Sequence, residues 1–218
     1  MGDEVELPSA YSLTPANGDP ELPHSWGFTG SATAKYTNGD VFVGDYVDGK
    51  KQGKGTYTHV NGDVFVGEYT DDKRTGVGMM TYASGGCYNG NFENGVRSGE
   101  GTFVYPTKDI YSGLWKAGKK SGEGFYVFAN SKYYYQGTWK NGEIVTGKWV
   151  LSPSRYFEGS FTRQKPSGDG KFVCSGYEVH GCYSQEVKPL DSGVGEAGKP
   201  PMEVANTWET YAMTAIEA

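Results

Sequence analysis

The chain has 218 residues, 34 glycines, 17 tyrosines and a net charge of −6 at pH 7, and this glycine and tyrosine content indicates a repetitive sequence more than an ordinary globular one. No apolar stretch approaches the roughly 18–20 residues of a membrane span, and the start MGDEVELPSA lacks the basic and apolar regions of a secretory leader. Three cysteines without C-x-x-C spacing fit a reduced, cytoplasmic protein.

The charges are distributed unevenly along the chain. Residues 1–25 hold five acidic side chains and no Lys or Arg, and residues 184–218 hold six acidic side chains and two lysines. Residues 26–183 hold the remaining 15 acidic and 18 basic side chains. Such a weakly basic body lacks the dense positive footprint of a nucleic-acid binder, so we expect no nucleic-acid partner.

Residues 1–25 are rich in proline and in acidic side chains. A segment of this composition buries too little apolar surface to fold by itself. We therefore expect a flexible, extended acidic arm ahead of the folded part of the chain.

A repeat follows the arm and continues to residue 183. Its core is an aromatic-x-Gly-x-aromatic block, first FVGDY at 42–46 and then FVGEY at 65–69, and a G-x-G pair follows nearly every block. The central glycines are residues 44, 67, 90, 113, 137, 159 and 181, and so regular a spacing indicates a repeat architecture. GSATAKYTNGD at 30–40 matches the second half of a unit, so we place the array at 26–183, as a half repeat and about six units.

Each unit has the pattern of a β-hairpin. Aromatic residues and glycines alternate with polar residues at a period of two, which predicts strands, and Asn-Gly pairs predict the turns between them. The fold class is therefore predicted as all-β, an elongated single-layer antiparallel meander in which aromatic rings lie across neighbouring glycines. The expected repeat-core residues are Phe42, Gly44, Tyr46, Phe65, Gly67, Tyr69, Tyr88, Gly90, Phe92, Tyr111, Gly113, Trp115, Tyr135, Gly137, Trp139, Phe157, Gly159 and Phe161.

GEIVTGKW at 142–149 is one residue short of a phosphate-binding loop. That motif needs a Ser or Thr for Mg²⁺ where this chain has Trp149, and it needs a strand before it and a helix after it. The segment also falls where a G-x-G pair of the repeat is due. We interpret it as a degenerate repeat and expect no nucleotide or other cofactor.

Polar loops join the two strands of each unit, from VDGKKQ at 47–52 to TRQKPS at 162–167, and most carry Lys or Arg. In a meander these loops lie along one edge. A solvated edge would account for the charges, and the functional alternative is a contact with an acidic protein or with anionic lipid. The candidate partner-binding residues there are Lys50, Lys51, Lys73, Arg74, Lys119, Lys120, Arg163 and Lys165.

Residues 184–218 form a tail in which PPMEVANTWETYAMTAIEA has apolar residues at helical spacing after Pro201. This pattern predicts a short helix at 201–217. The helix either caps the last strand or docks on a partner, with Trp208 and Tyr211 as its anchors.

No constellation of catalytic or metal-binding residues stands out in the sequence. Cys174, His180 and Cys182 form the one cluster that suggests zinc, but a fourth ligand is missing. No recognisable nucleophile and base occur in order, so we expect a protein that is not an enzyme and holds no metal.

The block Y/F-x-G-x-W/Y with its G-x-G pair resembles the MORN repeat family over residues 26–183. The end of the array, with Gly176, Glu178, His180, Gly181 and Tyr183, resembles the radial spoke head members of this family in motile cilia and flagella.

This resemblance implies a non-catalytic scaffold of the axonemal radial spoke head, in the cytoskeleton of a cilium or flagellum. It would contact other spoke-head subunits and the central apparatus and support the regulation of motility. Self-association is a further expected contact. The alternative from another class is a MORN scaffold that binds phosphoinositides or tethers a membrane.

Overall fold

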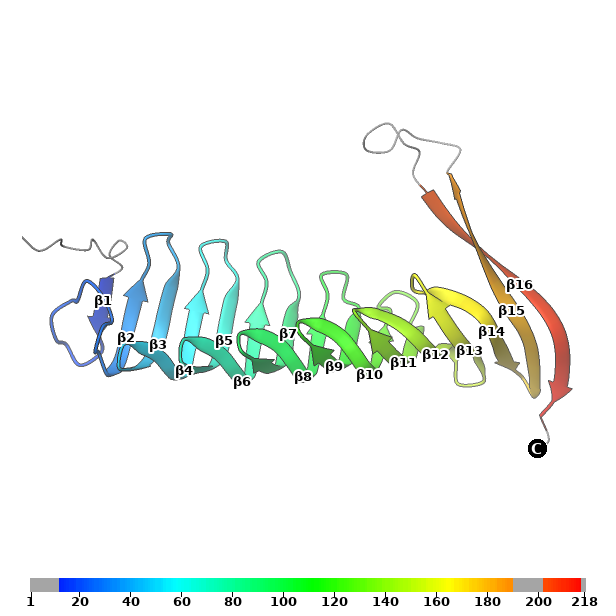
Figure 1. Ribbon diagram of the computed structural model, residues 1–218, viewed down its shortest axis with the longest axis horizontal. Coiled ribbons are helices and arrows are strands. Elements are labelled where there is room, and N and C mark those ends of the chain that lie inside the picture. The colour runs from blue at the N-terminus through cyan, green and yellow to red at the C-terminus, as the bar shows by residue number, and fades with distance from the viewer. Residues whose placement is uncertain (1–11, 190–201, 217–218) are drawn as a thin grey trace, which may run out of the picture. The chain divides into compact units, whose positions relative to one another are not determined.

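The structure is a computed structural model that describes residues 12–189 and 202–216. These residues form β-strands and no helix, and the strands follow one another in chain order from β1 to β16 without a crossover (Figure 1). Each described strand pair is antiparallel. The prediction of an all-β, single-layer antiparallel meander is confirmed.

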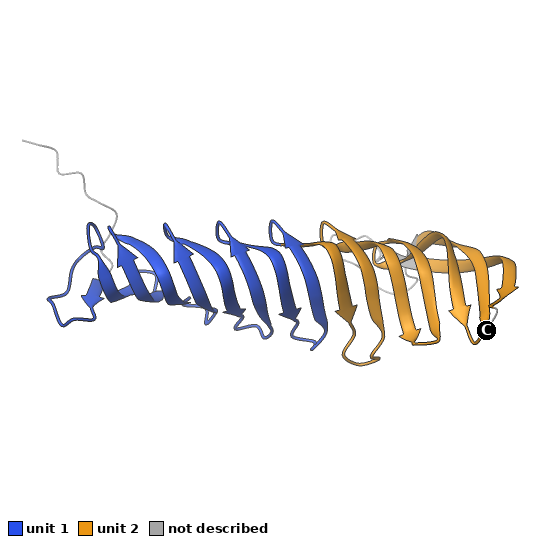
Figure 2. Ribbon diagram, turned by 90° about the horizontal axis from the view of Figure 1, so that it is seen from below, with its two compact units in different colours: residues 1–118 blue, residues 119–218 orange. Residues whose placement is uncertain are grey.

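The chain forms two compact units, residues 1–118 and 119–218 (Figure 2). The strands of the first unit are β1 Ser12–Pro15, β2 Gly30–Lys35, β3 Val41–Val47, β4 Lys50–Thr58, β5 Val64–Thr70, β6 Lys73–Thr81, β7 Cys87–Glu93, β8 Val96–Val104 and β9 Ile110–Lys116. Those of the second unit are β10 Lys119–Val127, β11 Tyr134–Lys140, β12 Glu143–Ser152, β13 Arg155–Thr162, β14 Lys165–Cys174, β15 Tyr177–Pro189 and β16 Met202–Ala215.

The hairpin turns are shorter than the sequence suggested. Between β3 and β4 only Asp48 and Gly49 lie outside the strands, and both have positive φ, at 48° and 79°. Two central residues with positive φ are the mark of a type I′ turn, whose twist matches that of a hairpin. The lysines that we assigned to the loop are therefore the first residues of β4.

A β-bulge explains the first glycine of each G-x-G pair. The register of β3 and β4 shifts between Gly44 and Tyr46, beside Gly53, whose φ is +70°. Glycine adopts this left-handed conformation at no steric cost, and it accommodates the extra residue of the bulge. Beyond the bulge Tyr46 lies opposite Lys51, so Lys51 shares the face of the aromatic rings.

The second glycine and the central glycine lie beneath a ring. A Cβ atom on Gly44 would lie 2.6 Å from Cζ of Phe42, and one on Gly55 would lie 2.5 Å from the same ring. Both distances are shorter than any real contact, so the Phe42 ring occupies the space that two side chains would need. The rings bury one face of the sheet without a second layer.

The sheet begins before residue 26, which corrects the expectation of a flexible arm over residues 1–25. Strand β1 pairs with β2, and Leu13 is fully buried. The backbone of Leu22 returns to Leu13 through hydrogen bonds of 2.8 and 2.9 Å and covers the outer edge of β1. This apolar pair gives the segment a stable place in the sheet, whereas residues 1–11 of the predicted arm lie outside the described residues.

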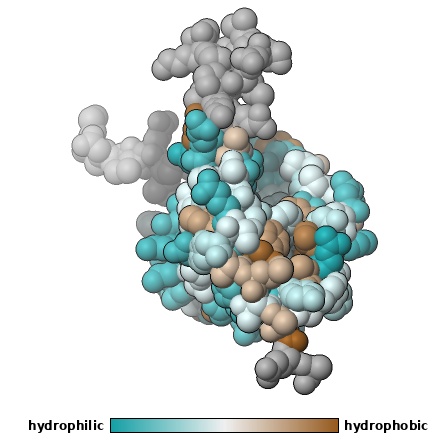
Figure 3. All heavy atoms as spheres, turned by 90° about the vertical axis from the view of Figure 1, so that its right-hand side faces the viewer, coloured by the Kyte–Doolittle hydropathy of each residue, from teal (hydrophilic) through white to brown (hydrophobic). Residues whose placement is uncertain are grey.

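The predicted helix at 201–217 is wrong, because Met202–Ala215 forms strand β16, paired along its length with β15. The segment contains Thr207, Trp208, Thr210, Tyr211 and Thr214, which favour strands. A helix so short would have little stability of its own, whereas β15 supplies backbone partners. In the view from the β16 end, hydrophobic residues lie among hydrophilic ones (Figure 3).

Candidate functional site

The aromatic residues of the repeat form one continuous packed face in the first unit. The rings at the first position, Phe42, Phe65, Tyr88 and Tyr111, are fully buried. Each of the first three packs edge to face against the last ring of the next repeat, with centroids 5.2 Å apart for Phe42 and Tyr69 and 5.0 Å apart for Phe65 and Phe92. This T-shaped geometry is favourable for aromatic pairs, so successive repeats are connected through their rings.

A row of cations lies over this face. Lys51, Arg74 and Arg97 occupy the second position of β4, β6 and β8, each opposite the last ring of its own repeat. The Lys51 ammonium is 5.6 Å from the Phe42 centroid, and the Arg97 guanidinium is 4.4 Å from the Trp115 centroid. Both distances are within the range of a cation–π contact. We call these three residues the cation row.

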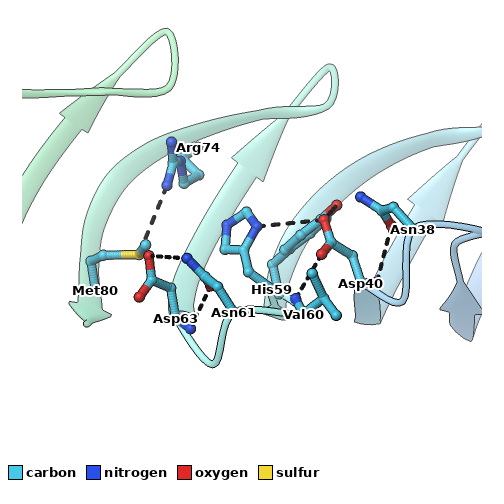
Figure 4. Close-up of polar contacts among 9 residues, drawn as sticks. Asn38, Asp40, His59, Val60, Asn61, Asp63, Arg74 and Met80 are labelled. Atoms are coloured by element: carbon cyan, nitrogen blue, oxygen red, sulfur yellow. Dashed lines mark hydrogen bonds and ion pairs between the residues drawn. The ribbon is translucent and has the colours of Figure 1, made fainter. Parts of the chain in front are cut away.

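The members of the cation row differ in their polar partners. Lys51 forms an ion pair of 3.2 Å with Asp72, and Nη2 of Arg97 donates a hydrogen bond of 2.9 Å to the carbonyl oxygen of Gly118. The Arg74 guanidinium lies over Phe65 and Phe92, at 5.4 and 5.7 Å, and its Nη1 contacts the Met80 sulfur at 3.9 Å (Figure 4).

The second unit holds a similar cation. Nζ of Lys120 lies 4.2 Å from the Trp139 centroid and 4.9 Å from that of Tyr126. Burial lowers the pKa of Lys120 to about 8, and the Glu143 carboxylate acts in the opposite direction. The lysine is thus held in a poorly hydrated position between rings.

The structure separates the basic residues that the sequence grouped together. Lys51, Arg74 and Lys120 are half-buried over rings, whereas the remaining candidates are exposed at the turns: Lys50, Lys73, Lys119, Arg163 and Lys165. Lys50 forms an exposed ion pair with Asp71 at 3.1 Å. Sequence reasoning missed Arg97, although residues 51, 74, 97 and 120 recur at the repeat period.

The two candidate anchors of the tail lie in different surroundings. The Trp208 ring packs against Tyr183 and Phe172, with centroids 4.9 and 5.2 Å away. The Tyr211 side chain is 64% exposed, because it lies at the bulge where the register of β15 and β16 shifts. Trp208 therefore belongs to the packed face of its unit and Tyr211 does not.

A buried carboxylate connects two turns at the start of the array. Asp40 is 6% exposed and accepts hydrogen bonds from the Tyr57 hydroxyl and the Val60 N–H, both at 2.8 Å. His59 lies 3.4 Å away (Figure 4). Burial favours a higher pKa for Asp40, but its hydrogen bonds outweigh this effect and lower the pKa below the usual value. Burial raises the pKa of Tyr57, and its hydrogen bond to Asp40 and the charge of that carboxylate raise it further.

The cysteine and histidine cluster of the sequence is not assembled as a metal centre. Cys174 and Cys182 are free thiols, and burial together with the Asp169 carboxylate raises the pKa of Cys182. His180 lies 3.4 Å from Glu178, which accepts a hydrogen bond of 2.7 Å from Lys171. Within residues 12–189 and 202–216, no three His, Cys, Asp or Glu side chains are grouped to hold a metal.

This geometry places the chain in the class of single-sheet proteins that are built from hairpin repeats. The MORN repeat family matches residues 42–64, 65–87, 88–110, 111–133 and 135–145. Three of these segments run from the first ring of one repeat to the residue before the first ring of the next repeat. We conclude that the chain carries MORN repeats over residues 42–145.

A particular relative is the radial spoke head 1 homolog of Cyprinus carpio, which is 32% identical over 85 residues. The match covers 38% of this chain and 37% of the relative, so it spans well under half of that protein. No helix in the described part of the chain is long and apolar enough to cross a membrane.

Proposed function

We propose that this chain is a non-catalytic scaffold of the radial spoke head in the axoneme of a motile cilium or flagellum. It would contact other spoke-head subunits and the central apparatus and thereby support the regulation of motility. The observation that carries the proposal is the 32% identity to a radial spoke head 1 homolog, in a chain whose matched repeats form a single sheet.

The architecture supports this role on physical grounds. Stability in a single-layer array comes from contacts between neighbouring repeats, as in the ring pairs Phe42–Tyr69 and Phe65–Phe92. One face of the sheet carries these rings and the cation row, and the other carries exposed side chains such as Val43, Val66 and Val77. Both faces of the described sheet therefore offer side chains that a partner could contact.

The test is the recovery of the tagged protein from a flagellated cell after detergent extraction. We expect it in the extracted axoneme, co-purifying with other spoke-head subunits. A membrane protein of the flagellum and a known spoke-stalk subunit serve as fractionation controls. Recovery in the membrane fraction alone would contradict the proposal.

The second candidate is a membrane-tethering scaffold that binds phosphoinositides. The observation in its favour is the set of exposed lysines at the turns, Lys73, Lys119 and Lys165. Flotation with anionic liposomes separates the two, because headgroup binding weakens as salt rises. Changing Lys119 to Glu should weaken flotation if this candidate holds, and it should leave axonemal recovery unchanged under the spoke-head proposal.

A further inference from the structure

A pocket of about 240 Å³ opens on the aromatic face of the first unit. Its walls include the rings of Tyr57, Phe65 and Tyr69, and its charged residues include Lys51 and Arg74 of the cation row. Strands β4, β5 and β6 supply these five residues, so the pocket rests on regular sheet. A site on strands keeps its geometry better than one on loops.

Arg74 is a half-buried donor in this pocket, and most of its hydrogen-bonding capacity is unused. A guanidinium has five N–H donors in a planar fork. Among the described residues, the Arg74 side chain donates to the thioether sulfur of Met80 at 3.9 Å. A thioether sulfur is a weak acceptor. Its guanidinium carbon lies 5.4 and 5.7 Å from the Phe65 and Phe92 centroids, and these cation–π contacts use none of its N–H groups.

Charge in the pocket favours an anion of modest charge. Lys51, Lys73 and Arg74 line it together with a single carboxylate, Asp72. Asp72 accepts hydrogen bonds from both Nζ and the backbone N–H of Lys51, at 3.2 and 2.9 Å. Lys51 is thereby neutralised, whereas the Arg74 fork matches the two oxygens of a carboxylate.

We propose that this pocket binds a glutamate or aspartate side chain from an acidic segment of a partner protein. Arg74 donates to the carboxylate, and the Tyr57 ring contacts the methylene part of the side chain. The inference deepens the proposed scaffold function and rests on it for its biological setting, since it identifies where an acidic spoke-head partner would attach.

Arg97 provides a matched control within the same unit. It too lies over two rings of the repeat core, Tyr88 and Trp115, but it already donates to the Gly118 carbonyl oxygen. Arg74→Met and Arg97→Met each remove one positive charge and one stacked guanidinium. Only Arg74→Met removes a donor from the pocket.

The experiment measures the fluorescence anisotropy of a labelled oligoglutamate peptide titrated with the full-length protein at fixed ionic strength. We expect Arg74→Met to weaken binding at least about tenfold, the loss of one charge-assisted hydrogen bond, and Arg97→Met to bind nearly as the wild type does. An oligoglutamine peptide should not bind. Equal weakening by both variants, or no binding by the wild type, would overturn the proposal.

Two further arms keep the test decisive. Thermal unfolding followed by circular dichroism shows whether Arg74→Met folds, and Arg74→Lys replaces it if it does not, because lysine keeps the charge and loses the fork. Inorganic phosphate and acetate compete against the peptide at equal concentration. If phosphate is the much stronger competitor, the pocket prefers a phosphoryl group and the carboxylate assignment is wrong.

The outcome is separate from that of the fractionation experiment. A protein that enters the axoneme but does not bind oligoglutamate would refute the pocket and leave the scaffold proposal intact. If the protein binds oligoglutamate through Arg74 but is found only in membranes, the scaffold proposal is refuted and the pocket is supported.

Discussion

At the scale of single residues, the fold depends on glycines that leave room for a ring and for a neighbouring backbone. A Cβ atom on Gly90 would lie 2.4 Å from Cα of Gly101 and 2.7 Å from the Tyr88 hydroxyl oxygen. A flexible side chain could move away from such a contact, whereas the backbone of a paired strand cannot.

We expect Gly90→Val to destabilise the first unit by about 3 kcal/mol or more, at the upper end of overpacking costs, and to lower its melting temperature. The control is Gly95→Asn, in a turn where nothing lies within 4 Å of the added Cβ and where φ is +87°. Asparagine tolerates this conformation, so the control should melt nearly as the wild type does. Unchanged melting of Gly90→Val would contradict the ring-over-glycine packing.

Asp40 allows a second test at this scale, because its stabilising effect depends on pH. The pKa of Asp40 is lower in the folded protein than its ordinary value of 3.8, so the folded state favours the ionised carboxylate. The resulting stability is present above that ordinary value and is lost as pH falls through the folded pKa.

Asp40→Ala should therefore cost about 1–3 kcal/mol at neutral pH, the penalty of leaving the Val60 N–H and the Tyr57 hydroxyl without their acceptor. The difference from wild type should shrink as pH falls below about 4. Asp63→Ala is the comparison. Asp63 accepts a hydrogen bond from the Ala83 N–H at the equivalent turn of the next repeat, where Met80 takes the place of Tyr57. Denaturant unfolding that shows equal losses at every pH would contradict this account.

At the scale of elements, the last hairpin shows how packing decides between helix and strand. Residues at helical spacing suggested a helix over 201–217, but Trp208 and Tyr211 lie in different environments of a strand. Trp208 covers Gly181, where a Cβ atom would lie 2.4 Å from the indole ring. The ring-over-glycine pairing of the repeat therefore continues into β16, where the sequence lacks a recognisable repeat block.

We expect Trp208→Ala to destabilise the second unit by about 2 kcal/mol, because the substitution removes the indole ring that packs against Phe172 and Tyr183. Tyr211→Ala should stay within about 0.5 kcal/mol, since that side chain is 64% exposed. Far-UV circular dichroism of both variants should retain the strand spectrum of the wild type. A larger loss from Tyr211→Ala would mean that the two residues are assigned the wrong roles.

The elements also show what sequence reasoning could reach. The spacing of glycines and aromatic residues was enough to predict the strands, because the period of two and the repeat length can both be read directly from the amino-acid sequence. The bulge at Gly53 was not foreseen, although it sets whether Lys51 faces solvent or rings. A shift of one residue reverses every side chain of a strand, which is why basic residues assigned to an exposed edge lie in part over the aromatic face.

At the scale of the whole molecule, the repeat was predictable and its partners were not. Each unit is held by contacts between neighbouring strands, and these follow from the periodic sequence. Arg74 and Arg97 occupy equivalent positions in the repeat, and their acceptors, Met80 and Gly118, are what distinguish their unused donors. A binding pocket of this kind depends on which side chains already satisfy each other, and periodicity carries no such information.

The most direct test of the central claim is electron cryotomography of axonemes from motile cells that lack this protein. If the chain is a radial spoke head scaffold, subtomogram averages should lose density from the spoke head while the spoke stalk remains, and expression of the wild-type chain should restore it. A complete spoke head in the cells that lack the protein would contradict the account.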